Sequence, residues 1–225
     1  MRYSGYYTGY FDGSIDEVYI YSSALDAASI QVLYAAVTAA PTVTPLPTHV
    51  SHSTLVAHYS FDDGTAADDS GAGLDGWVSG ATATTGLDAR GALAFDGSGQ
   101  YAGAGMVSSY LSAALPRTVC VWAVVDAFDG GALFSVGSDA DGREFGLSTD
   151  SGNPTPVDGR IQVQFYGGDP YDTDVDVAGS DDGAWHHYCL TYDGSDWALY
   201  FDGLYEAGEV ERPVRPVVRL SLIHI

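Results

Sequence analysis

The stretch that decides the fold runs from residue 185 to residue 203 and reads WHHYCLTYDGSDWALYFDG. It contains two runs rich in aromatic residues, His186–Tyr192 and Trp197–Phe201. Each run is followed by an Asp-Gly pair, which is typical of a turn. The stretch therefore predicts two β-strands that end at turns.

The same alternation of short apolar runs and Gly/Asp turns continues upstream as far as Leu55. Phe95-Asp96-Gly97 and Phe128-Asp129-Gly130 repeat the ending Phe201-Asp202-Gly203. The chain has 28 glycines and no long helical period after Leu55, which predicts an all-β sandwich or jelly roll. The further strands expected are Leu55–Phe61, Ala92–Phe95, Thr118–Val125, Ala132–Val136, Glu144–Ser148, Arg160–Tyr166 and Asp174–Val177.

The N-terminal part has a different character. Tyr6–Phe11 and Ile15–Tyr21 read as extended segments with a turn at Asp12-Gly13 between them. Ala27–Ala36 has apolar residues at helical spacing and predicts a short helix. Residues 37–54 contain prolines that alternate with threonine, which predicts a semi-rigid linker and a domain boundary.

The charge of the chain limits its partners. Thirty acidic residues stand against eight basic ones, so the formal net charge is −22. A field of this sign repels phosphate backbones and anionic lipid surfaces, which argues against nucleic-acid binding. No apolar run reaches the roughly 18–20 residues that a membrane span needs, so we expect no membrane insertion.

Three segments carry a resemblance to a known family. Thr118–Ala123, Trp185–Gly194 and Trp197–Gly203 resemble laminin-G-like jelly rolls, and more closely the pentraxin-like branch of the concanavalin A-like lectin/glucanase superfamily. Leu55–Gly64 resembles the opening strand of such a domain, and Gly9–Ala36 resembles its closing strand and helix. The resemblance implies a concanavalin A-like antiparallel jelly-roll sandwich with one short helix.

The order of these segments differs from the family pattern, because the closing segment precedes the opening strand. We expect residues 1–36 to be the C-terminal closing segment of a preceding module and residues 37–54 to be a linker. Residues 55–211 then form a jelly roll without its closing strand, and residues 212–225 read as an aberrant, artefactual tail.

A second arrangement of the N-terminal segment follows from the same resemblance. The first and last strands are neighbours in this fold, so Ile15–Tyr21 can fold back beside the opening strand. The linker is long enough for this at about 3.1 Å per extended residue. We predict that Ile15–Tyr21 pairs antiparallel with the strand around Ala57–Phe61 and completes the second module as a circular permutant. The helix at Ala27–Ala36 should pack against the same sandwich.

The resemblance also assigns the two cysteines. In pentraxin-like relatives the positions that match Cys120 and Cys189 are joined by a disulfide, so the resemblance implies one here. A disulfide indicates an oxidising, extracellular or cell-surface location. The neighbouring pair His186-His187 is a weaker candidate for a metal site, because consecutive strand residues point to opposite faces and cannot chelate one ion.

Two acidic loops are candidates for calcium binding. Pentraxin-like relatives bind calcium partly from the loop that matches Asp139 and Asp141, with Glu144 as a further ligand. The second loop contains Asp62, Asp63 and Asp69, which are ordinary Asx-turn residues as well as oxygen ligands suited to Ca²⁺. We therefore name calcium as the cofactor to test.

We expect no enzyme activity. Glycoside hydrolases need two carboxylates that flank a cleft, and the adjacent Asp16-Glu17 should face opposite sides of a strand. The favoured function is a non-catalytic recognition or adhesion module with a carbohydrate or glycoprotein ligand. The alternatives are a structural spacer repeat of a surface protein and an accessory domain of a larger glycoside hydrolase or protease. Exposed aromatic residues around an Asp loop would favour sugar binding, and a featureless polar rim would favour the spacer.

Overall fold

A computed structural model describes residues 9–38, 54–105, 115–137, 144–150, 159–165 and 171–208. Helix α1 (Ala27–Thr38) and a 3₁₀ turn (Leu87–Ala89) accompany the strands. The strands are β1 (Asp12–Tyr21), β2 (Leu55–Tyr59), β3 (Trp77–Ser79), β4 (Thr82–Thr85), β5 (Gly91–Asp96), β6 (Tyr101–Gly103), β7 (Arg117–Val125), β8 (Ala132–Gly137), β9 (Glu144–Thr149), β10 (Arg160–Phe165), β11 (Tyr171–Asp176), β12 (His186–Tyr192), β13 (Trp197–Phe201) and β14 (Leu204–Gly208).

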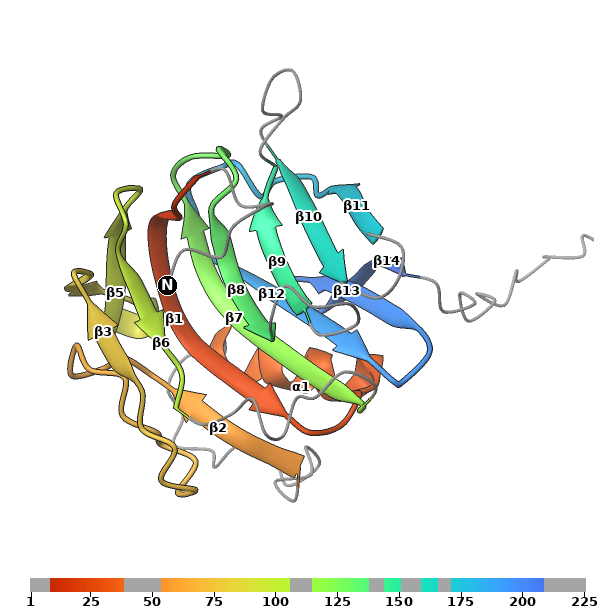
Figure 1. Cartoon of the computed structure of the whole chain (residues 1–225), viewed down its shortest axis with the longest axis horizontal. Coiled ribbons are helices and arrows are strands. Elements are labelled where there is room, and N and C mark those ends of the chain that lie inside the picture. Colours follow the sequence, from red (N-terminus) through yellow and green to blue (C-terminus); the bar gives the residue numbers. More distant parts are fainter. Residues whose placement is uncertain are drawn as a thin grey trace, which may run out of the picture.

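The strands form two facing sheets and a small ribbon (Figure 1). The large sheet has the order β14-β13-β12-β7-β1-β5-β4, and β2 also pairs with β1. The second sheet has the order β11-β10-β9-β8, and β3 pairs with β6. Every strand pair in the described residues is antiparallel. The predicted class, an antiparallel jelly-roll sandwich with one helix, is confirmed.

Strand β1 occupies the middle of the large sheet. It pairs with β2 in the register Val18↔Tyr59 and Ile20↔Ala57, so the predicted antiparallel pairing is confirmed. It also pairs with β5 near its start and with β7 along most of its length. The N-terminal segment therefore contributes a central strand to the same sandwich as the other described strands.

The predicted turn at Asp12-Gly13 is wrong, because both residues lie within β1. Gly13 pairs with Val125 of β7, and its φ is 145°. A Cβ atom built on Gly13 would lie 2.1 Å from the carbonyl oxygen of Val124. The glycine thus serves the close approach of two strand backbones, which is the other common use of this residue.

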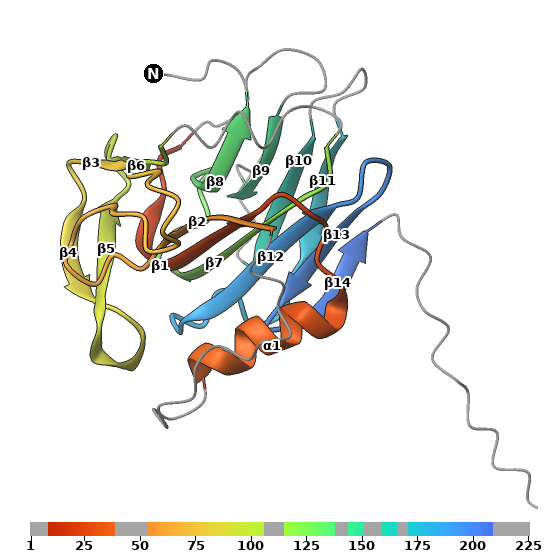
Figure 2. The ribbon, with the colours of Figure 1, turned by 90° about the horizontal axis from the view of Figure 1, so that it is seen from below.

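The apolar core has two parts, one on each face of the large sheet. The larger part lies between the two sheets and contains alternate residues such as Val119, Val121 and Leu190. The smaller part lies on the outer face, where α1 buries Ile30 and Leu33 against the sheet (Figure 2). The prediction that the helix packs against the sandwich is therefore confirmed, and the helix extends two residues beyond the predicted end at Ala36.

The strands that the sequence analysis missed are β3, β4, β6 and β14. All four residues of β4, which read TATT, are exposed, so this edge strand has no apolar alternation. Strand β14 forms the opposite edge of the large sheet and follows the turn at Gly203. Within the described part of the chain, no helix has the length and apolar character to span a bilayer.

Candidate functional site

The β3–β6 ribbon presents an aromatic outer face to solvent. Trp77 lies opposite Gly103, and Ser79 lies opposite Tyr101. Val78 and Ala102, between them, pack against the core, so Trp77, Ser79, Tyr101 and Gly103 share the outer face. The exposed fraction is 55% for Trp77 and 46% for Tyr101. Large aromatic side chains with this exposure are typical of contact surfaces.

The indole ring of Trp77 rests on the backbone of Gly103. A Cβ atom at Gly103 would lie 2.3 Å from both Cε2 and Cζ2 of the Trp77 ring. One face of the ring is therefore covered by the glycine, and a side chain larger than hydrogen at position 103 would displace it. This packing orients the indole while a large part of it stays in solvent.

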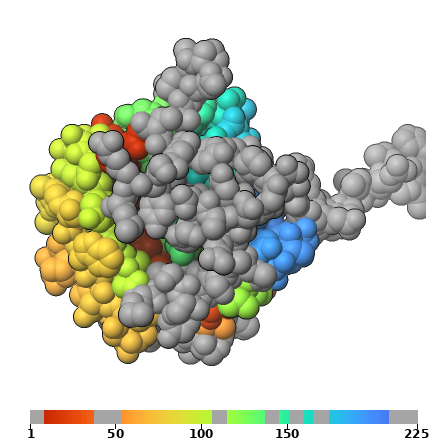
Figure 3. Space-filling view, viewed as in Figure 1, coloured from red at the N-terminus to blue at the C-terminus, as the bar shows by residue number. Residues whose placement is uncertain are grey.

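A shallow pocket of about 320 Å³ adjoins Trp77. It is lined by Gly64–Ala67 on one side and by Asp75–Val78 on the other. The backbone N–H of Gly76 donates a hydrogen bond of 2.7 Å to the carbonyl oxygen of Ala66 and joins the two sides. Figure 3 shows the orange to yellow-green residues of this region gathered along one side of the molecule. We call the ribbon's outer face and this pocket together the Trp77 face.

The acidic loop that was predicted as a calcium candidate borders the Trp77 face. Asp63 accepts hydrogen bonds from the backbone N–H and the hydroxyl of Thr65, at 2.9 and 2.6 Å. Asp62 accepts a hydrogen bond from the backbone N–H of Gly91, and Asp69 accepts one from the hydroxyl of Ser60. Within the described residues these three carboxylates do not form a cluster of three ligand atoms within 4.8 Å. Their observed contacts are those of turn-stabilising residues.

The other calcium candidates are not placed by the structure. Asp139 and Asp141 lie outside the described residues. Glu144 is the first residue of β9, and its side chain is also outside the described part of the structure. Their role in calcium binding stays a prediction.

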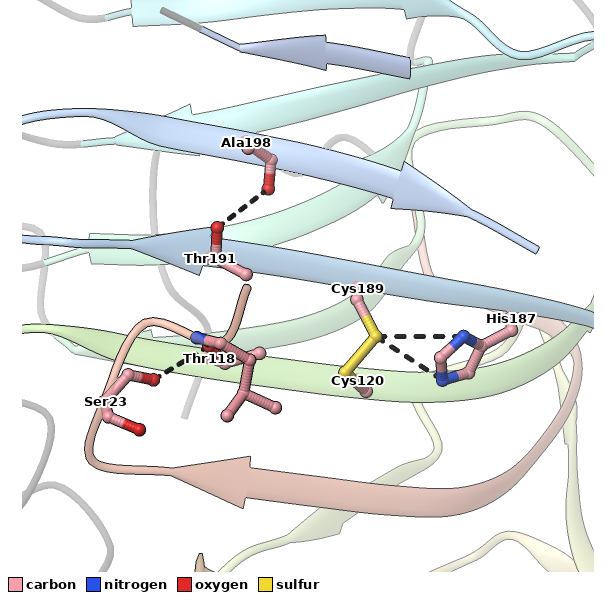
Figure 4. Close-up of a disulfide and its surroundings, with 8 residues drawn as sticks. Ser23, Thr118, Cys120, His187, Cys189, Thr191 and Ala198 are labelled. Atoms are coloured by element: carbon pink, nitrogen blue, oxygen red, sulfur yellow. Dashed lines mark hydrogen bonds between the residues drawn. A yellow bond between two sulfur atoms is a disulfide. The ribbon is translucent and has the colours of Figure 1, made fainter. Parts of the chain in front are cut away.

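Cys120 of β7 and Cys189 of β12 lie opposite each other, with their Cα atoms 4.1 Å apart. They form a disulfide (Figure 4), as the family resemblance implies. His187 is fully buried beside it, with Nε2 3.4 Å from Sγ of Cys189. Burial lowers the pKa of His187 to about 3. His187 is thus a neutral core residue against Trp122 and Tyr34.

His186 points away from His187, as strand geometry predicted. Its two ring nitrogens lie 2.9 Å from a carboxylate oxygen of Asp202 and 3.0 Å from one of Asp182. Desolvation opposes the charged form of His186, but these two carboxylates outweigh it and raise its pKa. The two contacts of His186 hold the turns that carry Asp182 and Asp202 to β12.

Sequence reasoning missed a buried polar network on β1. A bulge interrupts the pairing of β1 with β7 between Asp16 and Tyr19, and Glu17 has a φ of 49°. Simple strand alternation therefore fails here, and both Asp16 and Glu17 are buried, at 1% and 5% exposure. Asp16 accepts hydrogen bonds from the backbone N–H groups of Glu17 and Leu87. A bulge inside a strand leaves no signal in the apolar pattern, which is why the sequence did not predict it.

Glu17 is held by partners from two strands. Its Oε2 atom accepts a hydrogen bond of 2.7 Å from the hydroxyl of Tyr19 and lies 2.6 Å from Nε2 of His58. The rings of Tyr19 and His58 stack with centroids 4.1 Å apart. Burial alone would raise the pKa of Glu17, but the contacts with His58, Tyr19 and Arg90 together lower it. This network ties β1 to β2 across the sheet.

Asp16 makes the stability of the fold depend on pH. Burial raises its pKa from 3.8 to about 7, although backbone hydrogen bonds oppose the shift. The folded state therefore binds this proton more tightly than the unfolded state. The protonated Asp16 carboxyl group therefore stabilises the folded state fully below about pH 4, and this contribution to the free energy of unfolding is lost as the pH rises through 7.

We expect Asp16→Asn to raise the free energy of unfolding at pH 8 by about 2 kcal/mol. The gain is roughly 4 kcal/mol from removing a buried charge, less about 1–2 kcal/mol for one lost hydrogen bond. Urea denaturation at pH 5 and pH 8 measures it, with Asp181→Asn on the exposed surface as the control. Equal effects of Asp16→Asn at both pH values would contradict the burial of a titrating carboxyl group.

The Laminin_G_3 family model, described as the concanavalin A-like lectin/glucanases superfamily, matches residues 96–218, which is more than half of the chain. No match to a curated protein was found. One similar solved structure is domain 4 of AbnA, a GH43 extracellular arabinanase from Geobacillus stearothermophilus, in complex with arabinotriose. It is 19% identical with a TM-score of 0.47, and the match covers 68% of this chain and 73% of that chain.

Proposed function

Because the chain belongs to the concanavalin A-like lectin/glucanases superfamily, we propose that it is a non-catalytic carbohydrate-binding module and that the Trp77 face is its binding site. Membership of a widely used fold does not define a ligand. The observation that carries the proposal is the pair of exposed aromatic residues, Trp77 and Tyr101, on one face of a ribbon beside a shallow pocket whose lining includes Thr65 and Asp75.

The chemistry of the Trp77 face suits a sugar chain. A pyranose ring has an apolar face of C–H groups that stacks on an aromatic ring, and its hydroxyl groups need hydrogen-bonding partners. Trp77 offers the aromatic surface, and Thr65 and Asp75 line the adjoining pocket with oxygen atoms. Tyr101 is a diagonal neighbour of Trp77 across the ribbon, at roughly 7–8 Å. At this backbone spacing, we propose that the two rings contact different sugar units of one chain.

The positions of the carboxylates support a binding role without catalysis. Hydrolysis of a glycosidic bond requires two carboxyl groups on opposite sides of a cleft. Among the described residues that line the pocket, Asp75 is the one carboxylate. Asp16 and Glu17, which do lie close together, are buried within the sheet and do not line it. The disulfide supports an extracellular location, because such bonds persist in oxidising compartments.

We expect Trp77→Ala to weaken glycan binding at least tenfold, equivalent to about 1.4 kcal/mol. The measurement is affinity electrophoresis and calorimetry of the whole chain with a panel of soluble polysaccharides that includes laminarin, xylan, galactan, mannan and hydroxyethyl cellulose. Tyr10→Ala is the matched control, because Tyr10 is also exposed, at 47%, and does not line the pocket.

The opposite pattern would contradict the site. If Tyr10→Ala abolished binding and Trp77→Ala did not, the binding surface would lie elsewhere on the module. If the folded protein bound no glycan of the panel, a structural spacer would become the better description of its function.

A further inference from the structure

We infer that the Trp77 face selects uncharged glycans and rejects chains that carry carboxylate or sulfate groups. This inference rests on the proposed function and adds the chemical class of the ligand. It is carried by the charges around the pocket and by the contacts that hold them in place.

One carboxylate lines the pocket and a second adjoins it, and both are held by hydrogen bonds. Asp75 lines it directly, and its Oδ1 atom accepts a hydrogen bond of 3.0 Å from the backbone N–H of Asp68. Asp63 stands behind Thr65, which also lines the pocket, and both the N–H and the hydroxyl of Thr65 donate to its Oδ1 atom. The carboxylates are thus part of the loop's own hydrogen bonding, so they cannot swing away from an approaching ligand without breaking the turn.

The surrounding loop keeps its negative charge at neutral pH. Hydrogen bonds from Thr65 lower the pKa of Asp63. Desolvation would raise the pKa of Asp68, but hydrogen bonds from Ser70, Leu74 and His58 outweigh it and lower that pKa. Asp63 and Asp68 therefore keep the loop beside the pocket negatively charged.

The described arginines are engaged elsewhere. Arg90 lies 3.9 Å from a carboxylate oxygen of Glu17, and Arg160 lies 2.9 Å from one of Asp176 on the second sheet. Arg117 is buried, with its guanidinium 4.7 Å from the centroid of the Phe145 ring. None of these three lines the pocket, so within the described residues no cation there offers a partner to an anionic sugar.

Repulsion of an anionic ligand at this surface should depend on salt. Charges in solvent interact over a Debye length of about 8 Å at physiological ionic strength and about 3 Å at 1 M salt. A carboxylated sugar seated on Trp77 would lie beside Asp75 and close to Asp63. A neutral sugar would meet the same carboxylates as hydrogen-bond acceptors for its hydroxyl groups.

The test uses matched derivatives of one glycan. The neutral polysaccharide of the panel that binds best is converted in parallel to a hydroxyethyl and a carboxymethyl derivative, which are similar in bulk and differ in charge. Binding is measured with the whole chain at 20 mM salt with EDTA, which removes bridging divalent cations. We expect the carboxymethyl derivative to bind at least tenfold more weakly, and the difference to fall to less than threefold at 1 M salt.

Variants locate the effect. The double variant Asp63→Asn/Asp75→Asn keeps the accepting Oδ1 atoms and removes two charges, so it should recover most of the binding of the carboxymethyl derivative. Asp181→Asn, an exposed residue outside the pocket, should recover none. Equal binding of both derivatives to the unmodified protein would overturn the inference and leave the proposed function intact, whereas failure of every glycan to bind would overturn both.

Discussion

A chain that starts at Thr54, and so lacks β1 and α1, is expected not to unfold cooperatively. Removing β1 leaves β7, β5 and β2 without their shared partner in the middle of the large sheet. It also uncovers the outer face of that sheet, which α1 buries. Unpaired strand edges of this kind aggregate readily.

The size of this effect follows from the apolar side chains that are lost. Burial of one aliphatic side chain contributes about 1.5–3 kcal/mol, so five of them contribute roughly 8–15 kcal/mol. That is as large as the whole stability of a typical domain, about 5–15 kcal/mol. The five buried aliphatic residues of the segment are Ile15, Ile20, Leu25, Ile30 and Leu33.

Fragment complementation provides the control. A peptide of residues 9–38, added to the truncated chain, should restore a cooperative thermal transition and near-ultraviolet circular dichroism. A peptide with Ile20→Asp, which places a charge at a site of 2% exposure in β1, should not. Cooperative unfolding of the truncated chain alone, at a temperature close to that of the full chain, would show that β1 is dispensable.

The second large effect concerns the disulfide. Replacing both Cys120 and Cys189 by alanine should lower the free energy of unfolding by about 4 kcal/mol, because the bond closes a loop with a sequence separation of 69. Both positions are fully buried, and alanine adds no polar group there, although it removes the sulfur atom that lies 3.4 Å from Nε2 of His187. Urea denaturation of the variant and of the unmodified protein, each with and without a phosphine reductant, measures the difference.

The reductant separates the bond from the packing. Reduction should destabilise the unmodified protein by a similar amount and leave the alanine variant unchanged. If reduction had no effect on the unmodified protein, the bond would not constrain the unfolded chain. If the variant lost much more than reduction did, packing around His187 and Trp122 would account for the excess.

The site was predictable only in part. Exposed aromatic residues around an Asp loop are the feature expected of a sugar-binding module, and the structure has exposed aromatic residues at Trp77 and Tyr101. The two residues themselves could not be selected from the sequence, because the chain has many aromatic residues and most of the strand ones are core. Exposure of Trp77 depends on its pairing with Gly103, which lies 26 positions away in the sequence.

The sequence by itself determined the class of the fold and much of its framework. Strands such as His186–Tyr192 and Trp197–Phe201 have their predicted bounds, because aromatic runs bounded by Asp-Gly turns are local signals. Tertiary structure alone decided three other features: the continuation of β1 through Asp12-Gly13, the bulge that buries Asp16 with Glu17, and the exposed Trp77 face. Each depends on which strand lies opposite, and contacts between strands distant in sequence leave no local pattern.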